Sequence, residues 1–278
     1  MPAADWMAAL PMLALALGGA AGVAALLSQP WRREWRRRRW RAQPFPPAWR
    51  RILRRRVPIV ARLPADLQQR LKRHVQVFLA EKVFIGCQGQ AIDDEVRVTI
   101  AAQACLLLLG AERGECFPQL RQVLVYPQAF AAHREQALGG GVMQEQRLVM
   151  TGESWGQGQV VLAWSDVLAG AADAADGRNV VLHEFAHQID QDKGAADGRP
   201  WRPGALARRR WARVMDQAFE QLRRQPSDLI DAYGATAPAE FFAVVTEVFF
   251  ERPQALAVEA PEVYRELALL YRVDPSGW

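Results

Sequence analysis

The segment NVVLHEFAHQID, residues 179–190, places two histidines four residues apart within a mostly apolar run. Because an α-helix has 3.6 residues per turn, His183 and His187 lie on one face, where both imidazoles can reach one metal ion at about 2.0 to 2.1 Å. Glu184 is rotated about 100° from His183 and can contact a metal-bound water without being a ligand. The pattern predicts a metal-binding helix in the core. A pair of hydrogen-bonded core histidines is the alternative.

A second segment, AYGATAPAEFFAVVTEVFF at residues 232–250, offers a third ligand. Pro238 is typical of the first turn of a helix, and Glu240 follows it in a strongly apolar sequence, where a carboxylate needs a partner. A catalytic zinc site uses three protein ligands and keeps a fourth position for water, so we predict that Glu240 completes the site. The alternative is a solvated stripe of Glu240, Glu247 and Glu251 on one face of the helix.

HEFAHQID followed by PAEFFAVVTEVFF resembles the Mlc titration factor A family of bacterial zinc metallopeptidases, whose catalytic core is similar to that of anthrax lethal factor. The resemblance extends from about Phe45 to near the C-terminus and includes TGESWGQGQVVLAWSDV at residues 151–167. It implies a gluzincin-like zinc peptidase. The implied zinc ligands are His183, His187 and Glu240.

The same resemblance implies that Glu184 is the catalytic base and that Tyr233, seven residues before Glu240, lies near the reacting carbonyl. An aromatic residue without a catalytic role is the alternative for Tyr233. In the toxin, a further Glu follows the AEFFA stretch directly, but Val244 stands here. Asp190 is therefore our candidate for orienting a ligand histidine.

The rest of the chain predicts helices and a few strands around this site. Helical periodicity is found at residues 63–84 and 93–110, and strands are expected at 122–130, 146–155 and 158–167. We predict an α+β, zincin-like metallopeptidase domain over residues 57–278, with a small mixed sheet and an active-site helix that carries HExxH. The strand around residues 160–164 is expected to hold an extended peptide along its free edge.

Charge is distributed unevenly along the 278 residues. Residues 32–56 contain twelve arginines, whereas the residues after Arg56 include 23 basic and 28 acidic side chains. The formal charge of +5 therefore comes from one arginine block, and a nucleic-acid surface on the body is not expected. Three cysteines without CxxC spacing predict buried thiols rather than a disulfide framework.

Residues 7–27 carry no charge, and 21 residues of helix are about long enough to cross the ~30 Å hydrocarbon core of a membrane. The arginines follow this run, which favours an anchor whose C-terminal side is cytoplasmic. We predict a transmembrane anchor at residues 1–30 and an arginine-rich juxtamembrane segment and linker at 31–56. The expected location is the inner membrane, as a single-pass protein with a cytoplasmic catalytic domain, or the cytoplasm if the segment does not insert.

Two functions follow from these residues. The first is hydrolysis of peptide or protein substrates with Zn²⁺ as cofactor. The second, implied by the resemblance, is sequestration of a sugar-responsive transcriptional repressor without a need for catalysis.

Overall fold

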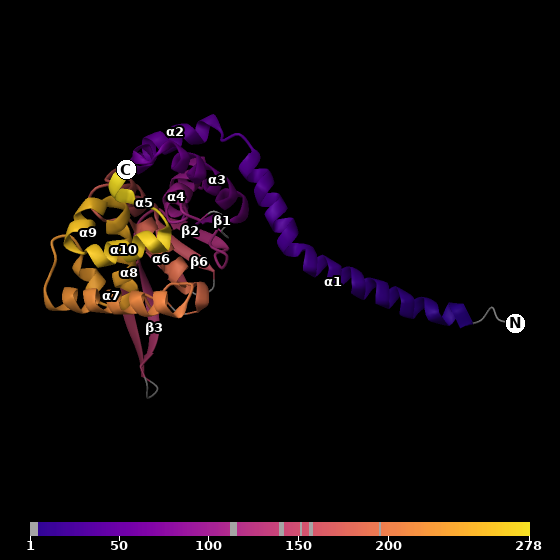
Figure 1. Cartoon of the computed structure of the whole chain (residues 1–278). Helices are drawn as coiled ribbons and strands as arrows, with labels where there is room; N and C mark the ends of the chain where they lie inside the picture. Colours follow the sequence, from indigo (N-terminus) through magenta and orange to yellow (C-terminus); the bar gives the residue numbers. More distant parts are fainter. Residues whose placement is uncertain (1–4, 112–115, 139–141, 151, 156–157, 195) are drawn as a thin grey trace. The chain divides into compact units, whose positions relative to one another are not determined.

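A computed structural model describes residues 5–111, 116–138, 142–150, 152–155, 158–194 and 196–278. The chain forms two compact units, Met1–Pro44 and Phe45–Trp278 (Figure 1). The second unit begins before the Pro-initiated helix α2, Pro47–Arg56, so this arginine-rich helix is part of the larger body. The predicted boundaries at residues 30 and 56 stay predictions.

The first unit contains helix α1, Asp5–Ala42, which joins the uncharged run and the arginines of residues 32–41 in one helix. Within the described residues, no helix combines the length and the apolar character that a membrane crossing requires. The prediction of a transmembrane anchor and of a membrane location is therefore wrong. It rested on the length and the lack of charge of residues 7–27, whereas the helix that contains this run continues into the arginines of residues 32–41, so α1 is not apolar along its whole length.

The second unit is built on a small mixed sheet with the strand order β1–β2–β6–β5. Strands β1 (Val83–Gly86), β2 (Gln122–Tyr126) and β6 (Gln159–Ala163) are parallel, and β5 (Gly152–Trp155) pairs antiparallel with β6. Residues from β2 and β6, including Val123, Val125 and Leu162, are fully buried, as β-branched and aliphatic side chains are in a covered sheet. The α+β class with a small mixed sheet is confirmed.

Two differences from the predicted strands affect the site. The strand predicted at residues 158–167 extends only from Gln159 to Ala163, and helix α5 (Trp164–Ala172) follows directly. Strand β6 lies between β2 and β5, so the predicted free edge on this strand is wrong, and β1 and β5 are the edge strands. Strands β3 (Phe130–Leu138) and β4 (Val142–Met150) form a separate antiparallel hairpin.

Helices cover the sheet and enclose the HEFAH segment. Figure 1 shows α3 (Ala65–Glu81) and α4 (Asp94–Leu106) on one side of the unit, with the C-terminal helices on the other. The HEFAH helix α6 (Val180–Asp190) contacts α4, α5, β5, β6 and α8. The C-terminal helices are α7 (Ala205–Arg224), α8 (Pro238–Glu251), α9 (Pro253–Glu259) and α10 (Pro261–Tyr271), and short 3₁₀ helices occupy Pro58–Arg62, Gln191–Lys193, Ala232–Ala235 (η3) and Pro275–Gly277.

The cysteines agree in part with their prediction. All three are free thiols, and Cys105 and Cys116 are buried, whereas Cys87 is half-buried. Burial raises the pKa of the Cys105 thiol, and contact with Cys116 raises it further, so this thiol is held in its neutral form.

Candidate metal centre

Helix α6 is fixed at its first turn by its cap and along its length by apolar packing. The Asn179 side-chain oxygen accepts hydrogen bonds from the backbone amides of Val181 and Leu182, both at 3.1 Å, which satisfies two donors that the helix leaves unpaired. Phe185 is fully buried, and the centroid of its ring lies 4.7 Å from the centroid of the Phe117 ring. This packing turns the opposite face of α6, with its histidines, toward α8.

Helix α8 begins at Pro238, and Glu240 lies in its first turn. A carboxylate at this position interacts favourably with the positive end of the helix dipole. Phe241 and Phe242 are buried directly after it, so the apolar side of the helix is anchored in the core while Glu240 points toward α6.

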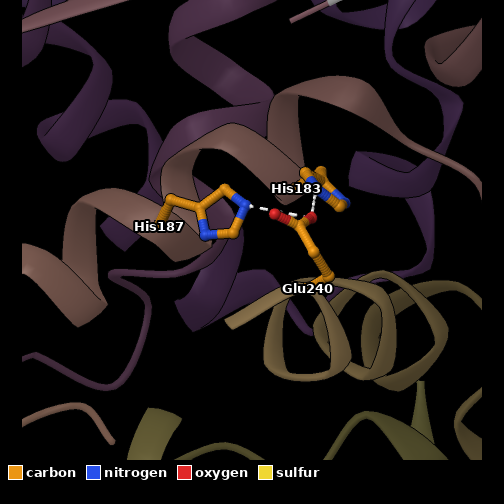
Figure 2. Close-up of side chains that lie close together, drawn as sticks. All are labelled: His183, His187 and Glu240. Carbon is orange, nitrogen blue, oxygen red and sulfur yellow. Dashed lines mark hydrogen bonds and ion pairs between the residues drawn. The ribbon is translucent and has the colours of Figure 1, made fainter. Parts of the chain in front are cut away.

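The two helices bring together the three predicted ligands (Figure 2). The carboxylate of Glu240 lies between the two imidazoles, and one of its oxygens is 3.0 Å from Nε2 of His183 and 3.4 Å from Nε2 of His187. One candidate ligand atom from each of the three residues lies within 4.8 Å of the others. Their side chains are 10 to 22% exposed, so the cluster is largely buried but remains partly accessible to solvent.

This geometry fits a zinc ion. Ligand atoms that bind a tetrahedral zinc at about 2.0 to 2.2 Å lie about 3.3 to 3.6 Å from one another, and the Glu240 oxygen lies 3.0 and 3.4 Å from the two imidazole nitrogens, close to this range. Two histidines and one carboxylate are a known donor set for catalytic zinc, which leaves one position for water or substrate. Within the described residues, this is the only cluster of three such side chains with suitable spacing.

The protonation states of the cluster depend on how close its side chains lie to one another. Burial opposes the charged form of His183, but hydrogen bonds to Glu240 and Glu247 outweigh burial and raise the pKa of His183 to about 10. Burial also opposes ionisation of Glu240, yet its hydrogen bonds to His183 and His187 hold its pKa well below its usual range. Glu240 is therefore an ionised carboxylate that attracts positive charge, which a proton or a metal cation can supply.

A second carboxylate, that of Glu247, contacts His183 at its other ring nitrogen, Nδ1. Oε1 of Glu247 lies 2.8 Å from Nδ1 of His183, and the other oxygen of Glu247 accepts a hydrogen bond from the backbone amide of Asn179. Glu247 and Glu251 are only 7% and 3% exposed, so the alternative of a solvated stripe is wrong. Their seven- and eleven-residue spacing from Glu240 places all three on one helix face, but that face packs against α6.

The two predicted catalytic residues lie beside the cluster. Glu184 is 5% exposed, and its negative charge contributes to the raised pKa of both His183 and Tyr233. Tyr233 lies in η3, and 54% of its surface is exposed. The centroid of its ring lies 5.9 Å from the centroid of the His183 ring. Burial, followed by the charge of Glu240, raises the pKa of Tyr233 to about 12, so its phenol stays protonated at neutral pH.

Asp190 makes no hydrogen bond to a ligand histidine within the described residues, although burial raises the pKa of its carboxyl and the nearby His187 opposes this rise. Its carboxylate accepts a hydrogen bond of 2.6 Å from the backbone amide of Gly198, and the contact to a ligand histidine is made by Glu247 instead. Val244 is buried and adjoins Gly234 in η3, where an added methyl group would lie 3.4 Å from it. The position that carries Glu in the toxin therefore contributes to packing here.

Known proteins are similar to this chain over most of its length. A protein of Synechocystis sp. named as uncharacterized is 41% identical over 251 residues, which cover 87% of this chain and 90% of that protein. Mlc titration factor A of Salmonella agona is 34% identical over 229 residues, with 79% of this chain and 84% of that protein covered. The corresponding protein of Salmonella arizonae is 35% identical over 230 residues, which cover 79% and 89%.

The model of the family described as glucose-regulated metallo-peptidase M90 matches residues 32–272 and therefore includes every residue of the cluster. This range, together with the relatives named Mlc titration factor A, confirms the resemblance found in the sequence. The chain belongs to the glucose-regulated metallo-peptidase M90 family.

Proposed function

We propose that this protein is a zinc-dependent peptidase with a zincin-like catalytic centre. The observation that carries the proposal is the convergence of His183 and His187 from α6 with Glu240 from α8 on one small volume. Family membership supports metallopeptidase chemistry, and the donor set favours zinc. When bound, zinc would supply a Lewis acid that polarises a peptide carbonyl and acidifies the attacking water.

Glu184 is assigned the proton transfers. It follows His183 on α6, and its carboxylate is buried beside the cluster. In this role Glu184 accepts the proton of the attacking water and then delivers it to the amine that leaves when the peptide C–N bond breaks. Tyr233 is assigned a different role, in which its neutral phenol donates a hydrogen bond to the carbonyl oxygen as negative charge develops there.

Strand β5 is assigned to the substrate. It is one of the two edge strands of the four-stranded sheet, and it contacts helix α6. An edge strand presents unpaired backbone amides and carbonyls that can pair with an extended peptide. This arrangement favours a peptide or unfolded protein segment as substrate.

Substitution of Glu184 by Gln tests the proposal. The change keeps size and hydrogen bonding but removes the base, so zinc should stay while hydrolysis of a fluorogenic peptide library falls by about a hundredfold or more. Glu262→Gln is the matched control, because Glu262 is exposed on α10. Hydrolysis at the wild-type rate by the Glu184→Gln protein would contradict the assignment of Glu184 as base.

A second function is suggested by the name of the relatives. The name Mlc titration factor A refers to Mlc, which we take to be the sugar-responsive transcriptional repressor that the resemblance implies. Sequestration of such a repressor is our alternative to proteolysis as the biological role. We expect the partner to be the repressor protein and not DNA, because the body carries more acidic than basic residues. If Glu184→Gln abolishes hydrolysis but leaves repressor binding and the cellular phenotype intact, sequestration is the function.

A further inference from the structure

Asn179 does more in this structure than cap a helix. Its side-chain oxygen caps α6, but its side-chain nitrogen faces a different set of partners. Nδ2 lies 2.9 Å from Oε1 of Gln103, 3.0 Å from Oε1 of Glu251 and 3.2 Å from the carbonyl oxygen of Gly170. These acceptors come from α4, α8 and α5, so one amide group joins three helices to the start of α6.

The same residue is connected to the metal cluster through its backbone. The amide of Asn179 donates a hydrogen bond to one oxygen of Glu247, whose other oxygen contacts Nδ1 of His183. Asn179 is 4% exposed and Glu247 is 7% exposed, so water does not readily replace either contact. A shift of Asn179 would therefore move Glu247, and with it the imidazole ring of His183.

A helix cap alone does not require this side chain. The cap uses only the oxygen, and aspartate or serine provides an equivalent oxygen at a helix N-terminus. The donor nitrogen is what distinguishes asparagine here. It satisfies Glu251, whose other oxygen accepts a hydrogen bond of 3.1 Å from the backbone amide of Gly177, so the segment before α6 is held to α8 at two points.

We propose that Asn179 is a positioning residue of the metal centre. Through its side-chain nitrogen Nδ2, Asn179 fixes the geometry of α6 relative to α8, in which Glu247 orients His183 for the metal. This inference rests on the proposed metal-binding function. In metal sites generally, partners that orient a ligand histidine affect metal affinity by about ten- to a hundredfold.

The test compares two exchanges of asparagine and aspartate at helix caps. Asn179→Asp keeps the cap oxygen but removes the donor nitrogen. Asp93→Asn is the matched control, because Asp93 caps α4 through a hydrogen bond of 2.9 Å from the amide of Val96, and α4 carries none of the three candidate ligands. For each protein we would measure zinc affinity by competition with a chelator, the visible spectrum of the Co²⁺-loaded form, and thermal unfolding.

We expect Asn179→Asp to weaken zinc binding by about ten- to a hundredfold and to alter the Co²⁺ spectrum, while Asp93→Asn leaves both unchanged. Asn179→Ser removes the nitrogen without adding charge and should act in the same direction, which keeps the test informative if the aspartate variant does not fold. In the double variant Asn179→Asp with Glu251→Gln, the glutamine side-chain nitrogen can donate to the aspartate carboxylate. This reverses the direction of the wild-type hydrogen bond and should recover part of the zinc affinity.

Wild-type affinity and an unchanged Co²⁺ spectrum in both Asn179 variants would overturn the inference and reduce Asn179 to a cap. Failure of the proposed function gives a different result, because the wild-type protein itself would then bind no zinc at a site that depends on His183 and Glu240. The comparison of wild type with the Asn179 variants thus separates the two.

Discussion

Glu247 contacts His183 on the ring nitrogen opposite the one that faces Glu240. The Nδ1 atom is 2.8 Å from Oε1 of Glu247, whereas Nε2 is 3.0 Å from Oε2 of Glu240. In the neutral ring, when Nδ1–H donates a hydrogen bond to Glu247, the lone pair of Nε2 is directed toward the ligand cluster. The rotation and the tautomer of this imidazole are thus set by a buried carboxylate of α8.

Replacing Glu247 tests this relationship. Glu247→Gln keeps an oxygen for Nδ1 but loses the negative charge, so we expect zinc affinity to fall by about ten- to a hundredfold without loss of the fold. Chelator competition gives the affinity, and Glu220→Gln on the exposed side of α7 is the control. Equal affinities in the Glu247→Gln protein and the wild type would show that the contact does not act on the metal.

The ligand set predicts a clear order of zinc contents. Wild-type protein should bind about one zinc per chain, His183→Ala and His187→Ala should lose nearly all of it, and Glu240→Ala should bind much more weakly. Metal analysis after dialysis provides the measurement. A full zinc content in Glu240→Ala would place the third ligand elsewhere.

Tyr233 separates positioning of the substrate carbonyl from metal binding. Tyr233→Phe should keep zinc and fold but lower the hydrolysis rate by roughly ten- to a thousandfold, because one hydrogen-bond donor to the developing oxyanion is lost. Tyr264→Phe is the control, since the Tyr264 hydroxyl bonds to Asp274 near the C-terminus. Steady-state kinetics with one peptide would decide, and an unchanged rate for Tyr233→Phe would assign this ring to packing alone.

Glu251 makes stability depend on pH. Burial, with a contribution from the charge of Asp176, raises the pKa of Glu251 to about 8 from 4.5. The folded protein then binds this proton more tightly than the unfolded chain does, so the free energy of unfolding falls as pH rises between about 4.5 and 8, by at most ~1.4 kcal/mol per pH unit.

Glu251→Gln should remove that contribution, because glutamine stays neutral at every pH. Urea unfolding of the metal-free proteins at several pH values between 5 and 8 measures the difference between wild type and variant. Parallel pH profiles for the two proteins would show that Glu251 is ionised in the folded state throughout this range.

The motif HEFAH and the position of Glu240 could be predicted from the sequence because they depend on local geometry. A spacing of four residues puts His183 and His187 on one helix face whatever surrounds the helix. The glutamate in an apolar segment after Pro238 indicated a carboxylate with a buried partner. The α+β class followed from local periodicity in the same way.

The supporting contacts depended on tertiary structure. Helical spacing placed Glu247 and Glu251 on the face of Glu240, but only the packing of α8 against α6 decided that this face is buried and not solvated. Likewise, the order of strands decided that β5, and not β6, lies at an edge of the sheet. A sequence gives the direction of a side chain relative to its own helix or strand, whereas its surroundings come from segments far away in the chain.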